Sequence, residues 1–356
     1  MFGGGNRDNV EKSDGKPKKL MWVLKALLLG QLLAFCNALS GVFNQIITSE
    51  TSKSLPACQT ALNYIFICLT YGIYQFKQNG LSIHLSRTGF KSFANAMIDV
   101  EAWYWIYKAY NLTSLTSVQS LDCLSIPVVI LISRFLLHKS YNWYQYGAVL
   151  LSILGVLFIV YSDYDPQDSS TVEGDIMCAL GALLFGVSTV CQEWILEDVG
   201  VYEYMGTVCW YAILLSGIKV AVLEGDILVR NVARHPHILL WMLALGASQF
   251  VFYSAMPAML LKFGSGAATI NILAADVYAA VAGVILFSLS YDAFYITGMA
   301  VTCIGIIIYT LKGEGNGSTI NDGSSDSLIK YSEKRLEDDS GPIDPDVRHL
   351  EIDKLS

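Results

Sequence analysis

The sequence carries little charge, and this scarcity is its most informative feature. Only 15% of its 356 residues are Asp, Glu, Lys or Arg, whereas 53% are apolar, and the mean hydropathy is +0.45. A soluble globular chain carries about 25% charged residues. The composition therefore excludes a set of soluble domains and indicates an all-α polytopic membrane protein, built from segments of roughly 20 apolar residues that cross a bilayer.

Clusters of metal ligands are also missing from the sequence. The eight cysteines lie at or inside hydrophobic segments without C-x-x-C spacing, and the five histidines lie outside these segments or at their ends. Such cysteines are typical of small buried apolar residues. The chain has no nucleotide-binding loop and no basic run of the kind that binds nucleic acid. We expect no metal, no cofactor and no nucleic-acid partner.

Ten hydrophobic segments fill most of the chain, and we interpret them as ten transmembrane helices. They cover 20–47, 56–76, 92–110, 114–137, 142–161, 174–196, 202–224, 237–261, 266–288 and 293–311. The long first segment indicates a retained signal-anchor rather than a cleaved signal peptide. Residues 20–312 are thus one ten-helix domain. The polar stretches 1–19 and 313–356 predict disordered tails.

Lysine and arginine are distributed unevenly between the two sides of the predicted membrane. With a cytosolic N-terminus, only Lys53, Arg230 and Arg234 fall in loops on the outer side, and most of the 23 basic residues fall on the other. The positive-inside rule then places both termini in the cytosol. No retention signal distinguishes the plasma membrane from a Golgi or endosomal membrane.

The two halves of the chain share a pattern. TSVQSLDCLSIPVVIL and GSGAATINILAADVYAA both begin with small or hydroxyl residues, place an amide before an aspartate (Asp122 and Asp276), and continue as apolar runs. Five spans in each repeat, 20–161 and 174–312, give the repeats opposite orientations. Inverted repeats are typical of alternating access, with the substrate near the midplane. The alternative is the general likeness of any two apolar hairpins.

Three blocks carry a resemblance to a known family: DVEAWYWIYKAYNLTSLTSVQSLDCLSIPVVILIS (99–133), FGVSTVCQEWILE (185–197) and MPAMLLKFGSGAATINILAADVYA (256–279). Through them, residues 20–312 resemble the drug/metabolite transporter superfamily, specifically the F-type branch of solute carrier family 35. The resemblance implies ten spans, cytosolic termini and a solute transporter in a lipid bilayer. It suggests a nucleobase- or nucleoside-like cargo, whereas nucleotide-sugar exchange is the theme of the wider family.

Polar side chains in the fourth span predict a cavity wall. Gln119, Asp122 and Ser125 follow one another at a spacing of three residues and share one helix face. A charged residue at the centre of a membrane helix costs at least about 2.5 kcal/mol, so Asp122 is a substrate-site candidate. The alternative is a structural hydrogen-bond network. Pro127 should kink the span and is a candidate gate hinge, or a packing feature.

The third span offers a second candidate set. Glu101, Trp105 and Lys108 share a face, on which the two charges would bind a hydrogen-bonding cargo and the aromatic ring would stack on it. The alternative is an aromatic belt at the outer interface, to which we assign Tyr107 and Tyr110.

The sixth and ninth spans complete the predicted substrate site. Glu193 lies near the cytosolic end of the sixth span, where a solvated rim position is the alternative. In the ninth span Thr269 and Asp276 share one face, and Asn271 and Tyr278 share another. Both faces cannot line one narrow path, and we prefer the face of Asp276.

Acids outnumber lysines in the predicted membrane interior, which holds Asp99, Glu101, Asp122, Glu193 and Asp276 against Lys25, Lys108 and Lys219. An anionic nucleotide sugar needs cations at the midplane, and the ninth span has none. The pattern favours a neutral or cationic cargo, and it fits proton coupling through a buried carboxylate. We predict secondary-active transport of a neutral, purine-type small molecule.

The same residues allow other functional classes to be compared. An intramembrane aspartyl protease needs a glycine beside each catalytic aspartate, and neither Asp122 nor Asp276 has one, so we expect no enzyme. An endomembrane nucleotide-sugar exchanger is the first alternative. A non-transporting scaffold acting through its acidic tail is the second. The sequence leaves the oligomeric state open, and a homodimer is one arrangement.

Overall fold

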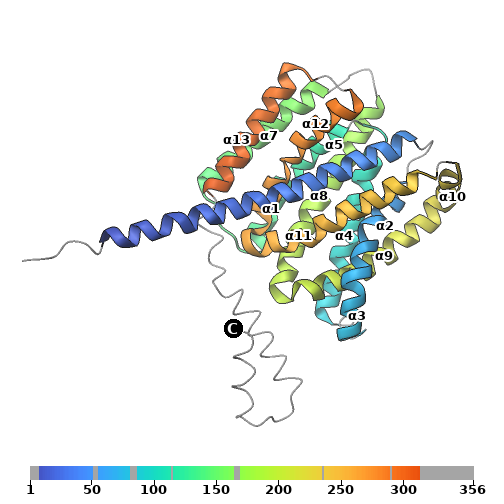
Figure 1. Ribbon diagram of the computed structural model, residues 1–356, viewed down its shortest axis with the longest axis horizontal. Coiled ribbons are helices and arrows are strands. Elements are labelled where there is room, and N and C mark those ends of the chain that lie inside the picture. Colours follow the sequence, from blue (N-terminus) through green and yellow to red (C-terminus); the bar gives the residue numbers. More distant parts are fainter. Residues whose placement is uncertain are drawn as a thin grey trace, which may run out of the picture. The chain divides into compact units, whose positions relative to one another are not determined.

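The computed structural model describes residues 8–50, 55–80, 86–113, 115–163, 169–234, 236–288 and 291–312, and every regular element in them is a helix. The chain separates into a unit of residues 1–316 and a unit of residues 317–356, and the description concerns the first. In chain order (Figure 1), the elements are α1 (Asp8–Glu50), α2 (Pro56–Ile67), η1 (Cys68–Gly72), α3 (Ile73–Asn79), α4 (Arg87–Ala109), α5 (Leu115–Leu121), η3 (Asp122–Leu124), α6 (Ser125–Leu136), α7 (Trp143–Asp163), α8 (Ser169–Asp198), α9 (Val201–Lys219), η4 (Val220–Glu224), α10 (Gly225–Arg234), α11 (Ile238–Ile272), α12 (Ala275–Phe287) and α13 (Ala293–Lys312).

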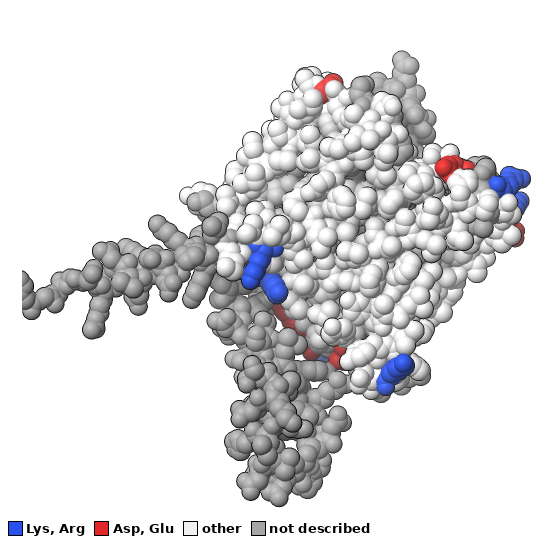
Figure 2. Space-filling view, viewed as in Figure 1, with Lys and Arg blue, Asp and Glu red and all other residues white. Residues whose placement is uncertain are grey.

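The described helices include five that are long and apolar enough to cross a membrane, namely Val23–Glu50, Trp143–Ser162, Val172–Asp198, Ile238–Leu286 and Ala293–Leu311. Many large apolar side chains point outward from them, among them Leu28, Leu150 and Ile285. Figure 2 shows one face of the molecule, and a broad surface without charged side chains lies across the middle of it. A helical protein with an apolar exterior is one of the few structures that a bilayer permits. The polytopic helical class expected from composition is confirmed.

Several predicted spans are interrupted helices. The second predicted span contains the π-helical segment η1, and the seventh contains the π-helical segment η4. Each of the two packs against the other span, η1 against α9 and η4 against α2. In the fourth, the 3₁₀ segment η3 separates α5 from α6. Segments of this kind are frequent at functional positions in helices.

The structure corrects three expected boundaries. Residues 225–236, expected as a loop, contain helix α10. The ninth predicted span breaks at Leu273–Ala274, and its first part joins the preceding helix through Gly264, whose φ is 83°. Helix α1 begins at Asp8, within the stretch 1–19 that was predicted to be disordered. The tail 313–356 lies outside the described residues.

Pro127 lies just beyond the break in the fourth predicted span. The interruption is at Asp122–Leu124, and Pro127 occupies the first turn of α6. A proline has no N–H for the carbonyl four residues earlier and is tolerated in a first turn, where no such bond is required. Because Pro127 is tolerated only in a first turn, the helix breaks just before it, at Asp122–Leu124. The hinge role of Pro127 stays a prediction.

The core of the bundle is built from pairs of closely packed helices. Helix α1 lies along α11, α4 along α8, and α7 along α13 (Figure 1). Between α7 and α13 the backbones approach so closely that a Cβ on Gly298 would come within 2.5 Å of the carbonyl oxygen of Gly155. Small residues allow membrane helices this proximity. The first two pairs and α5 surround the centre, where buried polar groups gather.

Candidate functional site

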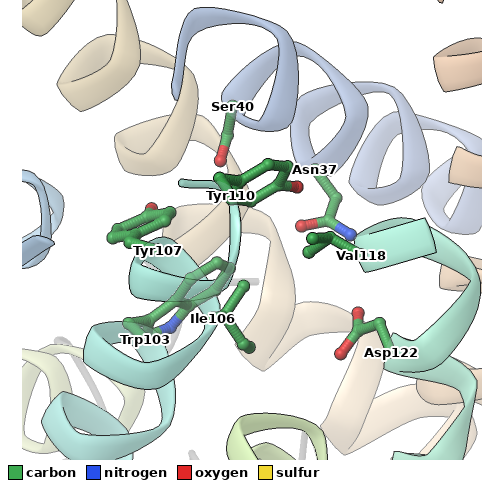
Figure 3. Close-up of a pocket in the computed structure, with 8 residues that line it drawn as sticks. All are labelled: Asn37, Ser40, Trp103, Ile106, Tyr107, Tyr110, Val118 and Asp122. Carbon is green, nitrogen blue, oxygen red and sulfur yellow. The ribbon is translucent and has the colours of Figure 1, made fainter. Parts of the chain in front are cut away.

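A small cavity lies between α1, α4 and the broken helix α5–η3 (Figure 3). Its volume is about 10 Å³, roughly the space that the centre of one water molecule requires. Eight residues line it: Asn37, Ser40, Trp103, Ile106, Tyr107, Tyr110, Val118 and Asp122. The cavity is too small for a ring compound, so in this conformation it is closed to a solute of that size.

The cavity wall combines aromatic faces with polar groups that lack partners. The rings of Trp103 and Tyr107 lie 5.3 Å apart. Within the described residues, Nε1 of Trp103 and Oδ1 of Asp122 have no hydrogen-bond partner, while the Asn37 side chain hydrogen-bonds the same aspartate. Buried polar groups are normally paired, so an open donor and an open acceptor mark a position that a ligand can complete.

Two residues assigned to an interfacial belt are instead part of this wall. Tyr107 and Tyr110 are buried, and both line the cavity. The hydroxyl of Tyr107 donates to Oδ1 of Asn63 over 2.9 Å. The belt assignment was wrong because the sequence gives the depth of a residue along a helix but not the direction of its side chain.

A buried carboxylate that was predicted to lie in the membrane interior, but not chosen as a substrate-site residue, joins four helices. Asp99 of α4 is 5% exposed and accepts hydrogen bonds from Tyr64 of α2 and Tyr253 of α11, both at 2.6 Å, and from Ser188 of α8 at 2.9 Å. The hydroxyl oxygens of Tyr253 and Tyr64 lie 3.3 Å apart, side by side on the carboxylate that accepts from both. Asp99, Tyr64, Tyr253 and Ser188 form what we call the Asp99 cluster.

The Asp99 cluster adjoins the cavity through α4. Asp99, Trp103 and Tyr107 follow one another at a spacing of four residues, which places them on one face of the helix. An acid inside a predicted span was the available signal for Asp99. Tyr64 and Tyr253, which donate to Asp99, lie in apolar segments without a nearby charged residue that would mark them as polar contacts. Only the packed structure shows that they bind Asp99.

Asp276 lies directly after the break that precedes α12. Its side chain is 2% exposed, and neither carboxylate oxygen has a hydrogen-bond partner among the described residues. It interacts electrostatically with Asp122. The sequence paired these two aspartates by position in a repeat, and in the structure the charge of Asp122 acts on Asp276.

The other candidates of the ninth span face elsewhere. The hydroxyl of Tyr278 donates to Gln31 of α1 at 2.8 Å. The amide of Asn271 donates to the carbonyl of Ala267 at 2.8 Å. The hydroxyl of Thr269 donates to the carbonyl of Ser265 within its own helix, at 2.9 Å. These contacts stabilise helices, and a role in substrate binding stays a prediction for all three residues.

The third-span candidates do not form the expected pair of charges. Glu101 makes an ion pair with Lys219 of α9 at 2.6 Å, and its side chain is 44% exposed. Lys108 lies 5.2 Å from the ring centre of Trp105. None of the three lines the cavity. Among the fourth-span candidates, Ser125 donates to the carbonyl of Asp122 at 2.7 Å, and the side chain of Gln119 lies outside the described residues.

Glu193 belongs to a cluster at one end of the bundle. Its side chain is buried, makes an ion pair with Lys139 from the turn after α6, and accepts a hydrogen bond from the backbone N–H of Ser265 at 2.9 Å. Ser265 opens the helical stretch that follows the kink at Gly264. The carboxylate thus caps a helix N-terminus, a position that favours negative charge. Glu193 ties three elements together and is not a solvated rim residue.

Replacing Gly264 by alanine should lower the free energy of unfolding by about 1–3 kcal/mol. Its φ of 83° is unfavourable for a residue with a side chain, and an added Cβ would lie 2.7 Å from Nζ of Lys139. The measurement is unfolding by sodium dodecyl sulfate in mixed micelles. Gly147→Ala, in a helix with open space around the glycine, is the matched control and should be neutral or stabilising.

Comparison with known proteins decides the family. The family model SLC35F, solute carrier family 35, matches residues 18–311. The chain belongs to solute carrier family 35. It is therefore a membrane transporter of small solutes, and members of this family are transporters rather than enzymes. The family resemblance read from the three sequence blocks is confirmed.

Relatives of this solute carrier occur in animals and yeast. Solute carrier family 35 member F2 of Mus musculus is 32% identical over 304 residues, covering 82% of this chain and 80% of the relative. The protein of the same name in Xenopus tropicalis is 30% identical over 301 residues, covering 81% and 76%. An uncharacterized family member of Schizosaccharomyces pombe is 26% identical and covers 82% of this chain and 58% of its own length.

A solved crystal structure of another protein has a similar fold. Its TM-score is 0.57 at 18% sequence identity, and the match covers 84% of this solute carrier and 99% of the other chain. At this identity the likeness concerns the fold alone.

Proposed function

We propose that this solute carrier moves a neutral, nucleobase- or nucleoside-like solute by secondary-active, alternating-access transport. The observation that carries the proposal is the closed cavity, in which the aromatic faces of Trp103 and Tyr107 adjoin an open indole N–H and the open carboxylate oxygen of Asp122. Aromatic faces stack on planar rings. An open donor and an open acceptor suit the edge of a heterocycle.

The charge of the cavity supports a neutral cargo over a nucleotide sugar. No lysine, arginine or histidine is among its eight lining residues, and its one charged group is the acid Asp122. A diphosphate group would be repelled by this carboxylate and would find no arginine or lysine there to bind it.

The helix breaks support a ten-span architecture of two inverted five-span repeats. The α5–η3–α6 break in the first half and the break before α12 in the second half each carry an aspartate, Asp122 and Asp276. Substrate sites in inverted-repeat transporters form at such discontinuous helices. Both termini would lie in the cytosol, in a plasma, Golgi or endosomal membrane, with one chain or a homodimer as the transporting unit.

The uptake of labelled adenine, guanine, adenosine and guanosine by purified protein in liposomes tests this function, with UDP- and GDP-sugars beside them. We expect saturable uptake of a purine compound and about a tenfold loss of uptake efficiency in Asp122→Asn and in Trp103→Leu, equal to about 1.4 kcal/mol of binding or transition-state free energy. Each variant removes a group that faces the cavity.

Asp198→Asn is the matched control, because this variant neutralises an exposed acid, 53% accessible, that pairs with Lys91. It should transport like the wild type. Uptake of a nucleotide sugar in place of the purines, or full uptake by both cavity variants, would contradict the proposal. Proton coupling is the second part of the proposal, and its site is considered next.

A further inference from the structure

Asp276 is buried in the first turn of α12, and among the described residues no side chain donates a hydrogen bond or supplies a positive charge to it. Both of its oxygens lack hydrogen-bond partners, and no ion pair of the described residues includes it. An isolated carboxylate in an apolar interior would cost tens of kcal/mol by Born solvation, and such groups take up a proton instead. Asp99 shows the contrast, since three hydroxyl donors stabilise its buried carboxylate.

Asp122 makes a second charge at this position unfavourable. It interacts electrostatically with Asp276, and the Cys123 thiol interacts with both carboxylates. Two acids that share a site do not both ionise. Asp122 is the member that can remain charged, because the Asn37 side chain hydrogen-bonds it and its other oxygen faces the cavity.

Among the described residues, the titratable and polar groups known to interact with the two aspartates or to line the cavity beside Asp122 carry no positive charge. They are the thiols of Cys123 (η3), Cys178 (α8) and Cys303 (α13), the phenols of Tyr107 and Tyr110 across the cavity (α4), and the neutral Asn37 and Ser40 (α1). Cys178 also interacts with Asp175, which accepts from Thr113 at 3.0 Å. Tyr278 of α12 itself donates to Gln31.

We propose that the Asp122–Asp276 pair is the proton-coupling site of this transporter and binds one proton, on Asp276, in the closed conformation. The inference rests on the proposed transport function and assigns its coupling ion. The proton comes from the aqueous phase and forms an O–H bond on the Asp276 carboxylate. Opening of the cavity hydrates Asp276 and returns the proton to water. Both aspartates lie at helix breaks, where a conformational change would alter their surroundings.

Infrared spectroscopy tests the proton without any cargo. The purified full-length protein in lipid should show, at pH 7, the carbonyl-stretch band of a protonated carboxylic acid that is lost in Asp276→Asn. The difference spectrum isolates this group from other acids, and asparagine has the shape of the neutral acid, so the variant should fold. Equal carboxylic-acid bands in the wild type and Asp276→Asn would overturn the assignment.

Transport supplies the second measurement. Liposomes that contain the protein are incubated with labelled adenosine outside as the probe, with and without an inward pH gradient of one unit. The wild type should accumulate the probe up to about tenfold when the gradient is present, since one pH unit is a tenfold proton gradient. In Asp276→Asn the ratio of uptake with and without the gradient should fall to about one, whereas Asp198→Asn should keep the wild-type ratio.

The two measurements separate the site from the transport function. If the wild type transports none of the purine probes, the proposed function fails while the infrared band still decides the proton site. If the wild type responds to a sodium gradient in place of the pH gradient, or if Asp276→Asn keeps the wild-type ratio, the proton assignment is overturned.

Discussion

Replacing Asp99 by alanine should lower the free energy of unfolding by about 3–5 kcal/mol. The substitution leaves the buried hydroxyls of Tyr64, Tyr253 and Ser188 without their acceptor. Each hydroxyl that loses its partner in the interior costs about 1–3 kcal/mol, and the loss of the charged acceptor removes the stronger class of hydrogen bond. Unfolding by sodium dodecyl sulfate in mixed micelles measures the effect.

A double-mutant cycle separates the hydrogen bonds of the Asp99 cluster from general packing loss. Tyr64→Phe removes one donor and should cost about 1–2 kcal/mol in the wild type. In the Asp99→Ala background the same change should cost close to nothing, because the acceptor is already gone. Equal effects in both backgrounds would show that the two residues do not interact as the 2.6 Å distance indicates.

Replacing Glu193 by alanine should lower the free energy of unfolding by about 2–4 kcal/mol. The change leaves Lys139 without its ion-pair partner and removes the acceptor for the N–H of Ser265. Breaking a buried ion pair by removing one member costs about 3–5 kcal/mol, and the partial exposure of Lys139, 19% of its side chain, reduces this figure. The same unfolding measurement applies.

Asp198 provides the control for Glu193 on the same helix. Its carboxylate pairs with Lys91 at 2.5 Å but is 53% exposed, so water screens the interaction. Asp198→Ala should cost less than about 1 kcal/mol. Similar losses for the two variants would mean that burial does not distinguish the two ion pairs.

The sequence predicts which polar residues are important better than it predicts which groups those residues contact. Asp122 was predicted as a cavity residue because a membrane aspartate is costly, and it lines the cavity. The sequence favours Glu193 as a cavity residue, with a solvated rim position as the alternative, whereas in the structure its buried carboxylate caps a helix and joins three elements. Glu101 and Lys108 were expected to act together, yet Glu101 pairs with Lys219.

The hydroxyl groups of the Asp99 cluster could not be identified from the sequence. Tyr64 and Tyr253 lie in apolar segments where an aromatic residue is unremarkable, and nothing in the sequence relates either one to residue 99. Their contact depends on how α2, α4 and α11 are rotated about their axes. That rotation is the sum of many packing contacts across the bundle.

By itself, the sequence determined the membrane class, the approximate position of each hydrophobic segment and the family. Each membrane helix forms its backbone hydrogen bonds within itself and exposes apolar side chains to lipid. Its composition therefore identifies it without knowledge of the neighbouring helices. The tertiary structure decided where the helices break and which polar groups meet. It alone showed that Asp276 and Asp122 interact electrostatically, that Trp103 lines a small cavity, and that hydroxyl groups surround Asp99. Those contacts join residues far apart in the chain, and only helix packing can bring them together.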